Sequence, residues 1–229
     1  MLPTITLFTK SISTYYLVML LGYCAMGALM HRRRGRYGLS AWQAASFTTA
    51  LMVSGVLGCK VLYVLQNLAE VRTHGLTAGG FSFFGAVFLI PPLMAAFGLA
   101  LGLRPARSLD AAAPCVALMI AMMRVGCFLN GCCGGWVTGW GFRWPTQAME
   151  SVGDFAILSW LLTVEDRGGR GLYPRFLVSY GAMRFCIEFL RDTEKAYLRL
   201  SDGQWCALAA VLIGAWALQR GRRRIRAAK

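Results

Sequence analysis

Long apolar runs separated by short polar segments make up most of the chain. A helix needs about 20 mostly apolar residues to cross a hydrocarbon core of roughly 30 Å. Seven segments approach that requirement, at residues 13–30, 41–65, 81–103, 109–129, 146–164, 174–190 and 204–218. The pattern therefore predicts an all-α, polytopic membrane protein with about seven transmembrane helices.

The composition agrees with this pattern. Of the 229 residues, 57% are hydrophobic and 15% are charged, whereas soluble domains carry about 25% charged residues. No polar stretch is long enough to build a separate soluble domain outside the membrane. We therefore expect a single transmembrane domain over residues 1–229.

The formal net charge of +14 comes largely from two arginine clusters, at residues 32–36 and 220–229. Each cluster flanks an apolar run, which is typical of cytoplasmic segments. Alternate loops and the C-terminus carry fifteen Lys and Arg residues, against six in the N-terminus and the other loops. We therefore predict that the N-terminus is outside and the C-terminus is cytoplasmic. No aromatic or polar readout residues lie among the arginines, so we expect no nucleic-acid partner.

Ionisable side chains inside membrane spans are energetically expensive and therefore indicate function. Those in or at the ends of the predicted spans are Lys60, Arg124, Glu150, Asp154, Arg184 and Glu188. Arg184 and Glu188 are four residues apart, so they share a helix face and can form an ion pair. That pair could serve structure or function, and Lys60 could bind a substrate or extend toward the membrane interface.

Residues 123–136 are rich in glycine and cysteine, which does not suit a regular helix facing lipid. Non-helical backbone at membrane depth is tolerated only where it is buried or lines a cavity. We therefore predict an irregular extracytoplasmic or re-entrant segment at residues 129–148. Its N–H groups and the Arg124 guanidinium would suit an anionic headgroup. The alternative is an ordinary extracytoplasmic loop with Arg124 at its root.

Three of the eight cysteines, Cys127, Cys132 and Cys133, fall in this glycine-rich segment. They could form a disulfide, pack as small apolar side chains or supply a nucleophilic thiol. A metal site is the less favoured interpretation, because His31 and His74 are far away in the sequence and no Cys-x-x-Cys pair exists. We therefore expect no bound metal and no cofactor.

Seven short motifs follow one another along the chain. They are Tyr15-Tyr16-Leu17 with Gly22-Tyr23, residues 58–63 (Gly-Cys-Lys-Val-Leu-Tyr), 80–85 (Gly-Phe-Ser-Phe-Phe-Gly), 124–131 (Arg-Val-Gly-Cys-Phe-Leu-Asn-Gly), 145–150 (Pro-Thr-Gln-Ala-Met-Glu), 180–191 (Tyr-Gly-Ala-Met-Arg-Phe-Cys-Ile-Glu-Phe-Leu-Arg) and 200–205 (Leu-Ser-Asp-Gly-Gln-Trp). Their order and content resemble those of the prolipoprotein diacylglyceryl transferases of bacterial plasma membranes, and Gly135 falls on the last glycine of the fourth motif.

The resemblance implies a multi-pass enzyme of the bacterial plasma (inner) membrane. Such an enzyme moves the diacylglyceryl group of phosphatidylglycerol onto the lipobox cysteine thiol of a preprolipoprotein and releases glycerol phosphate. Carried over by position, Arg124 binds and polarises the leaving phosphate, and Arg184 assists while Glu188 holds it. The implied catalytic residues are Arg124, Arg184, Glu188 and Tyr15. The implied substrate-binding residues are Arg124, Lys60, Asn130, Gly131, Gly135 and Glu150.

Four positions depart from the family pattern. Lys60 replaces an arginine, Phe84 a histidine, Cys127 an asparagine and Cys132 a glutamate. The usual general base is therefore missing, and the positive field of the arginines would have to favour the acceptor thiolate. Two alternatives follow: a headgroup transferase with another acceptor nucleophile, and a non-catalytic lipid-binding protein. The charges kept inside the spans argue against the second.

Overall fold

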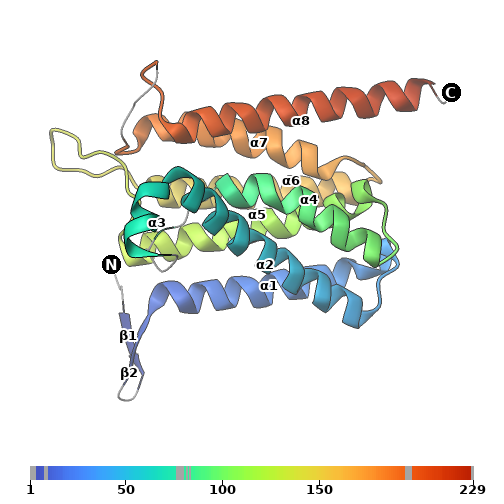
Figure 1. Ribbon diagram of the computed structural model, residues 1–229, viewed down its shortest axis with the longest axis horizontal. Helices are drawn as coiled ribbons and strands as arrows, with labels where there is room; N and C mark the ends of the chain where they lie inside the picture. The colour runs from blue at the N-terminus through green and yellow to red at the C-terminus, as the bar shows by residue number, and fades with distance from the viewer. Residues whose placement is uncertain are drawn as a thin grey trace. The chain divides into compact units, whose positions relative to one another are not determined.

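The computed structural model describes residues 4–7, 10–75, 80, 82, 84–193 and 198–227 (Figure 1). Residues 81 and 83, at the start of the third predicted span, lie outside the described residues, as do Lys195 and Lys229. The regular secondary structure of the described residues is helical apart from an antiparallel hairpin of β1 (Thr4–Leu7) and β2 (Lys10–Ser13). The α-helices are α1 (Thr14–Tyr37), α2 (Ala41–Gln66), α3 (Leu68–His74), α4 (Phe84–Ala100), α5 (Pro105–Asn130), α6 (Thr146–Asp166), α7 (Leu172–Ile187) and α8 (Asp202–Ala227), and α7 continues into the 3-10 helix η1 (Glu188–Leu190).

Each of the seven predicted segments contains a helix, but several boundaries differ. The first was expected to end at Met30, whereas α1 continues through the arginine cluster to Tyr37. The last was expected to end at Leu218, whereas α8 reaches Ala227. Arginine is a good helix former, so a helix extends past the end of its apolar run. The hairpin and α3 are too short to produce a membrane-length apolar pattern, and the sequence did not predict them.

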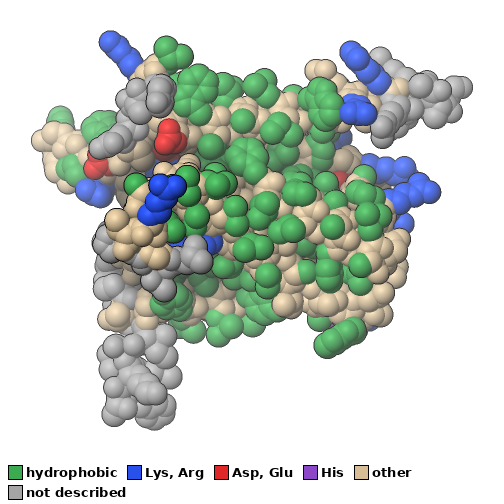
Figure 2. All heavy atoms as spheres, in the orientation of Figure 1, with side chains coloured by type: hydrophobic (Ala, Val, Ile, Leu, Met, Phe, Trp, Pro, Cys, Tyr) green, Lys and Arg blue, Asp and Glu red, His purple; other side chains and the backbone are tan. Residues whose placement is uncertain are grey.

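Three helices are long and apolar enough to cross a membrane, namely α1, α2 and α5, and α4 is a shorter apolar helix. Hydrophobic side chains spread over much of the face seen in Figure 2. Leu20, Val53 and Leu212 are each more than half exposed, at 57%, 58% and 62%. Such exposed apolar surface on helices of this length fits contact with lipid. The protein is therefore a helical membrane protein.

The chain forms two compact units. Unit 1 comprises Met1–Leu29 and Ala113–Lys229. Within it, α7 packs against α8 and against α6 (Figure 1). The fully buried rings of Phe176 and Tyr180 stack on α7 with their centroids 5.4 Å apart. The charged side chains lie near the start of α6 and at the end of α7.

Unit 2 comprises Met30–Ala112, and its main contact is between α2 and α4. A side chain at Gly58 could not fit, because its Cβ would lie 2.5 Å from the Gly85 carbonyl oxygen. Arg33, counted in the first arginine cluster, is buried. It donates hydrogen bonds to the Ala111 carbonyl oxygen (2.9 Å) and the Tyr37 hydroxyl (3.2 Å). One charge of that cluster is thus also structural.

Candidate active site

Unit 1 gathers four of the predicted site residues into one buried cluster. Arg124 comes from α5, Glu150 from α6, Arg184 from α7 and Glu188 from the start of η1. Their exposed fractions are 5%, 0%, 6% and 2%, respectively. Residues from three helices separated in sequence therefore meet away from solvent, and buried charges of this kind must pair with one another.

Glu150 lies at the centre of the cluster. Its Oε2 forms an ion pair with the Arg124 Nε at 2.5 Å, and its Oε1 is paired with the Arg184 Nη1. The Arg191 Nη1 also donates to Oε1, at 3.2 Å. Glu150 was predicted to bind substrate. It is fully buried and contacts three guanidiniums, an arrangement that fits positioning of the arginines, and its role in substrate binding stays a prediction.

Glu188 is the second carboxylate of the cluster. The Arg184 Nη2 lies 2.6 Å from its Oε2, which confirms the ion pair expected from the four-residue spacing. The hydroxyls of Ser201 (3.1 Å) and Thr193 (3.3 Å) donate to its Oε1. Ser201 also accepts from the Gln204 N–H at 3.2 Å and so caps the start of α8. Glu188 therefore ties α7 to α8.

The sequence analysis did not count Arg191 as a site residue, although it falls within the sixth motif. Arg191 lies just after η1 and contacts both carboxylates, with its Nε 3.7 Å from the Glu188 Oε2. Its spacing could have identified it as a site residue. Arg191 is three residues after Glu188 and seven after Arg184, so all three share a helix face. It was assigned to a loop because the apolar run ends at Leu190.

The cluster contains more positively charged than negatively charged paired side chains. The guanidiniums of Arg124, Arg184 and Arg191 face two paired carboxylates. Asp154 lies one turn after Glu150 and is fully buried, but its oxygens have no hydrogen-bond partner among the described residues. The three guanidiniums and two carboxylates together thus carry a net charge of +1. This net charge suits binding of an anionic phosphate.

Tyr15 lies beside this cluster on α1. A Cβ at Gly126 would lie 3.1 Å from the Tyr15 Cδ2, so the glycine leaves room for the ring against α5. The phenol is also close enough to Arg124 and Cys127 to interact with them electrostatically. The structure therefore places Tyr15 beside the arginine cluster, and its catalytic role stays a prediction.

The segment between α5 and α6 is irregular, with two isolated bridges, Gly135 to Arg191 and Val137 to Arg143. Asn130 is exposed at the end of α5, and Gly131 follows with a left-handed φ of 78°. The buried Gly135 donates its N–H to the Trp144 carbonyl oxygen at 2.9 Å. Its bridge to Arg191 connects the segment to the cluster. The roles of Asn130, Gly131 and Gly135 in substrate binding stay predictions.

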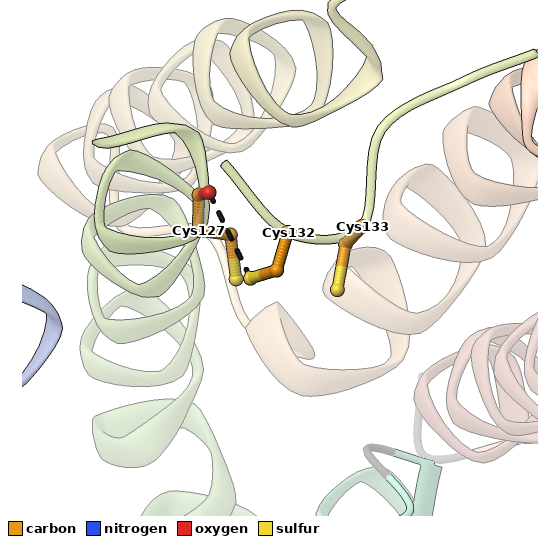
Figure 3. Close-up of side chains that lie close together, drawn as sticks. All are labelled: Cys127, Cys132 and Cys133. Atoms are coloured by element: carbon orange, nitrogen blue, oxygen red, sulfur yellow. Dashed lines mark hydrogen bonds between the residues drawn. The ribbon is translucent and has the colours of Figure 1, made fainter. Parts of the chain in front are cut away.

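Cys127, Cys132 and Cys133 are not joined by a disulfide in this structure, so the disulfide alternative is not realised in it. Cys127, Cys132 and Cys133 lie together, the last two on the loop after α5 (Figure 3). A hydrogen bond from Cys127 and the guanidiniums of Arg191 and Arg124 lower the pKa of Cys133 to about 5. The site therefore holds one exposed thiolate at neutral pH.

Two other positions singled out in the sequence belong to unit 2. Lys60 is half-buried on α2, with its ammonium 5.2 Å from the centroid of the Tyr63 ring. Phe84, at the family's histidine position, is the buried first residue of α4. The role of Lys60 in substrate binding stays a prediction.

Fold and site together define a class: a helical membrane protein with a buried arginine–glutamate cluster beside an irregular, thiol-rich segment. The family model described as "Prolipoprotein diacylglyceryl transferase" matches residues 3–220. The chain therefore belongs to the prolipoprotein diacylglyceryl transferase family, which confirms the resemblance found in its motifs.

Several curated proteins named phosphatidylglycerol–prolipoprotein diacylglyceryl transferase are similar to the chain. The relative from Clostridium tetani is 26% identical, over 91% of this chain and 92% of its own length. The relative from Methylobacillus flagellatus is 29% identical, over 89% and 88%. The relative from Cupriavidus metallidurans is 30% identical, over 72% of each. The similarity thus extends over most of both chains.

Proposed function

We propose that the protein transfers the diacylglyceryl group of phosphatidylglycerol to the lipobox cysteine of a preprolipoprotein, and so acts in lipoprotein maturation. Family membership and the names of the relatives support the reaction. The observation that carries the proposal is the buried cluster of three arginines and two glutamates. A protein that only bound lipid would have no reason to maintain such an expensive group of charges.

The reaction needs one bond to form and one to break. The acceptor sulfur bonds to the glycerol carbon that bears the phosphate, and that carbon–oxygen bond breaks. The electron pair leaves with the oxygen as glycerol phosphate, and the proton of the thiol ends on that phosphate. Arg124 and Arg184 would stabilise the charge on the leaving phosphate, because guanidiniums in a dry site act strongly on developing negative charge. Glu150 and Glu188 would hold them in position.

The proposed setting is the bacterial plasma membrane, crossed about seven times. The distribution of Lys and Arg supports an outside N-terminus and a cytoplasmic C-terminus, because fifteen lie on the predicted cytoplasmic side and six on the other. The segment between α5 and α6 would then be extracytoplasmic. This side is where a lipobox cysteine would meet the donor lipid after export.

Purified protein in detergent, given phosphatidylglycerol and a lipobox peptide, is expected to form a thioether diacylglyceryl peptide and free glycerol phosphate. Mass spectrometry detects the first product and an enzymatic assay the second. Arg124→Ala is expected to abolish turnover. Arg33→Ala is the matched control, because it removes a buried guanidinium from unit 2. No product from folded wild-type protein, or full activity in Arg124→Ala, would contradict the proposal.

A further inference from the structure

Three thiols form a compact group at the end of α5. The sulfur atoms of Cys127, Cys132 and Cys133 all lie within 4.8 Å of one another. Figure 3 shows the three side chains pointing to the same side of the loop. Cys127 is buried, Cys132 half-buried and Cys133 exposed, so the group opens toward the surface on one side. An ion could therefore enter without the helices separating.

Hydrogen bonds to the backbone of the loop hold these thiols in place. The Cys132 N–H donates to the Cys127 carbonyl oxygen at 3.2 Å. Gln147 donates to the Cys132 carbonyl oxygen at 2.6 Å, and Thr146 to that of Cys133 at 3.2 Å. The first turn of α6 thus fixes the loop that carries two of the sulfurs. A site built this way is preorganised for a ligand.

Cys133 has a backbone conformation that favours glycine. Its φ is 61°, in the left-handed region, where a side chain is disfavoured. Glycines stand at positions 131, 134 and 135, yet a cysteine occupies the strained position. In this conformation the Cys133 sulfur lies within 4.8 Å of the other two, and backbone strain of this kind clusters at functional sites.

The sulfur geometry decides between a disulfide and a metal ion. Zinc binds thiolate at about 2.3 Å, so tetrahedral ligands lie roughly 3.8 Å apart. A mutual separation within 4.8 Å is close to that value for all three sulfurs, whereas a disulfide would use only two of them. The complex of a divalent ion with three thiolates carries one net negative charge. The nearby guanidiniums of Arg124 and Arg191 would stabilise that charge.

We propose that Cys127, Cys132 and Cys133 bind one soft, thiophilic metal ion of the zinc class, with the fourth coordination position open. Thiolate ligands select such ions over magnesium and calcium, which require oxygen. A metal ion here differs from the expectation from the sequence, which relied on distant histidines and on the absence of a Cys-x-x-Cys pair. It does not rest on the proposed transferase activity.

Cobalt titration tests the site directly. Full-length protein in detergent is freed of metal, reduced and titrated with Co²⁺ under anaerobic conditions. We expect one Co²⁺ per chain, with sulfur-to-cobalt charge-transfer absorption and the strong visible bands of tetrahedral cobalt. Zn²⁺ should then displace it. Each of Cys127→Ser, Cys132→Ser and Cys133→Ser should weaken binding by about 100-fold or more.

Cys206→Ser is the matched control, because Cys206 is a half-buried thiol on α8 outside the group. It should bind cobalt as wild type does. Wild-type protein that shows no thiolate–cobalt absorption after reduction would overturn the proposal, and so would binding unchanged in the triple serine variant. Binding with 1:1 stoichiometry that is lost in all three single variants and kept in Cys206→Ser supports it. Metal binding is measured without turnover, so transferase activity does not affect either result.

Discussion

Glu150 is the carboxylate on which the buried cluster depends, since all three guanidiniums contact it. Removing one partner of a buried ion pair leaves an uncompensated charge and costs about 3–5 kcal/mol. We therefore predict that Glu150→Gln lowers the free energy of unfolding by about that amount and reduces turnover by roughly 100-fold or more. Thermal unfolding in detergent and the peptide transfer assay measure the two effects.

Asp154→Asn is the matched control for Glu150→Gln. Asp154 lies on the same helix as Glu150 and is as fully buried. Both substitutions replace a carboxylate with an amide. Its oxygens accept no hydrogen bond from the described residues, so the change leaves no donor unpaired. We expect a stability change within about 1 kcal/mol and nearly unchanged turnover. Inactivation as severe as that of Glu150→Gln would place Asp154 in the reaction itself.

Cys133 is predicted to react as a thiolate in mildly acidic solution. Its pKa is lowered to about 5 by the hydrogen bond from Cys127 and by Arg191 and Arg124. A group with a depressed pKa stays deprotonated until the pH falls through that value. In reduced, metal-free protein, alkylation by iodoacetamide should therefore be nearly as fast at about pH 6 as at pH 8, whereas an ordinary thiol slows by about 100-fold.

Peptide-resolved mass spectrometry measures this alkylation, with free cysteine in the same solution as the comparison. Arg191→Gln removes one of the charges and should restore a steeper pH dependence at Cys133. Equal slowing of Cys133 and of free cysteine between the two pH values would show that the neighbouring charges do not act on this thiol.

For individual residues, the sequence predicted which charged side chains lie within the spans but not which of them form ion pairs with one another. The spacing of Arg184 and Glu188 sufficed, because both lie on one helix. The pairing of Arg124 with Glu150 depends on α5 and α6 meeting, and no local spacing reports that contact. The thiol group was seen as a cluster in the sequence, but its geometry depends on the hydrogen bonds of the loop to Thr146 and Gln147.

At the scale of elements, the start of α8 matters because it touches Glu188. A Cβ at Gly203 would lie 2.8 Å from the Glu188 Oε1, so a side chain there would push the carboxylate away from Arg184. We predict that Gly203→Ala lowers stability by about 1–3 kcal/mol, as overpacking does, and reduces turnover roughly tenfold. Thermal unfolding and the transfer assay report both.

Gly221→Ala is the control on the same helix, because nothing lies within 4 Å of the added Cβ. Replacing a helical glycine by alanine stabilises by about 0.5–1 kcal/mol. This variant should therefore keep full activity and unfold at the same or a higher temperature. If both variants lose activity equally, α8 acts through its length rather than through contact with Glu188.

The helices themselves were the most predictable part of the fold. Apolar runs of membrane length locate α1, α2 and α5 because lipid requires that composition over the whole helix. The runs also locate α6, although Glu150 and Asp154 interrupt it, because both charges are buried inside the protein. The hairpin at residues 4–13 and α3 were missed, since neither is long enough to show a hydrophobic period.

At the scale of the whole molecule, the net charge of +14 says less than its distribution. The charges proposed to face the cytoplasm determine orientation. Those of Arg124, Arg184 and Arg191 are paired in the cluster. We therefore attribute the strongly basic composition to two separate demands, the predicted topology and the proposed chemistry.

Orientation is testable at the two ends of α6, the helix whose charges make it the weakest predicted span. Trp140, in the irregular segment before α6, is 98% exposed, and Asp166 is the exposed last residue of the helix. The predicted topology places the first outside and the second in the cytoplasm. Labelling is read at the introduced cysteine by peptide mass spectrometry, because the exposed native Cys133 also reacts. A membrane-impermeant maleimide applied to intact cells should therefore label residue 140 in Trp140→Cys and leave residue 166 in Asp166→Cys unlabelled, and permeabilised cells should label both positions. Neither substitution removes a Lys or Arg, so the charge bias that sets orientation stays intact. Labelling of Asp166→Cys alone in intact cells would mean the opposite orientation, and labelling of both would mean that α6 does not cross the membrane.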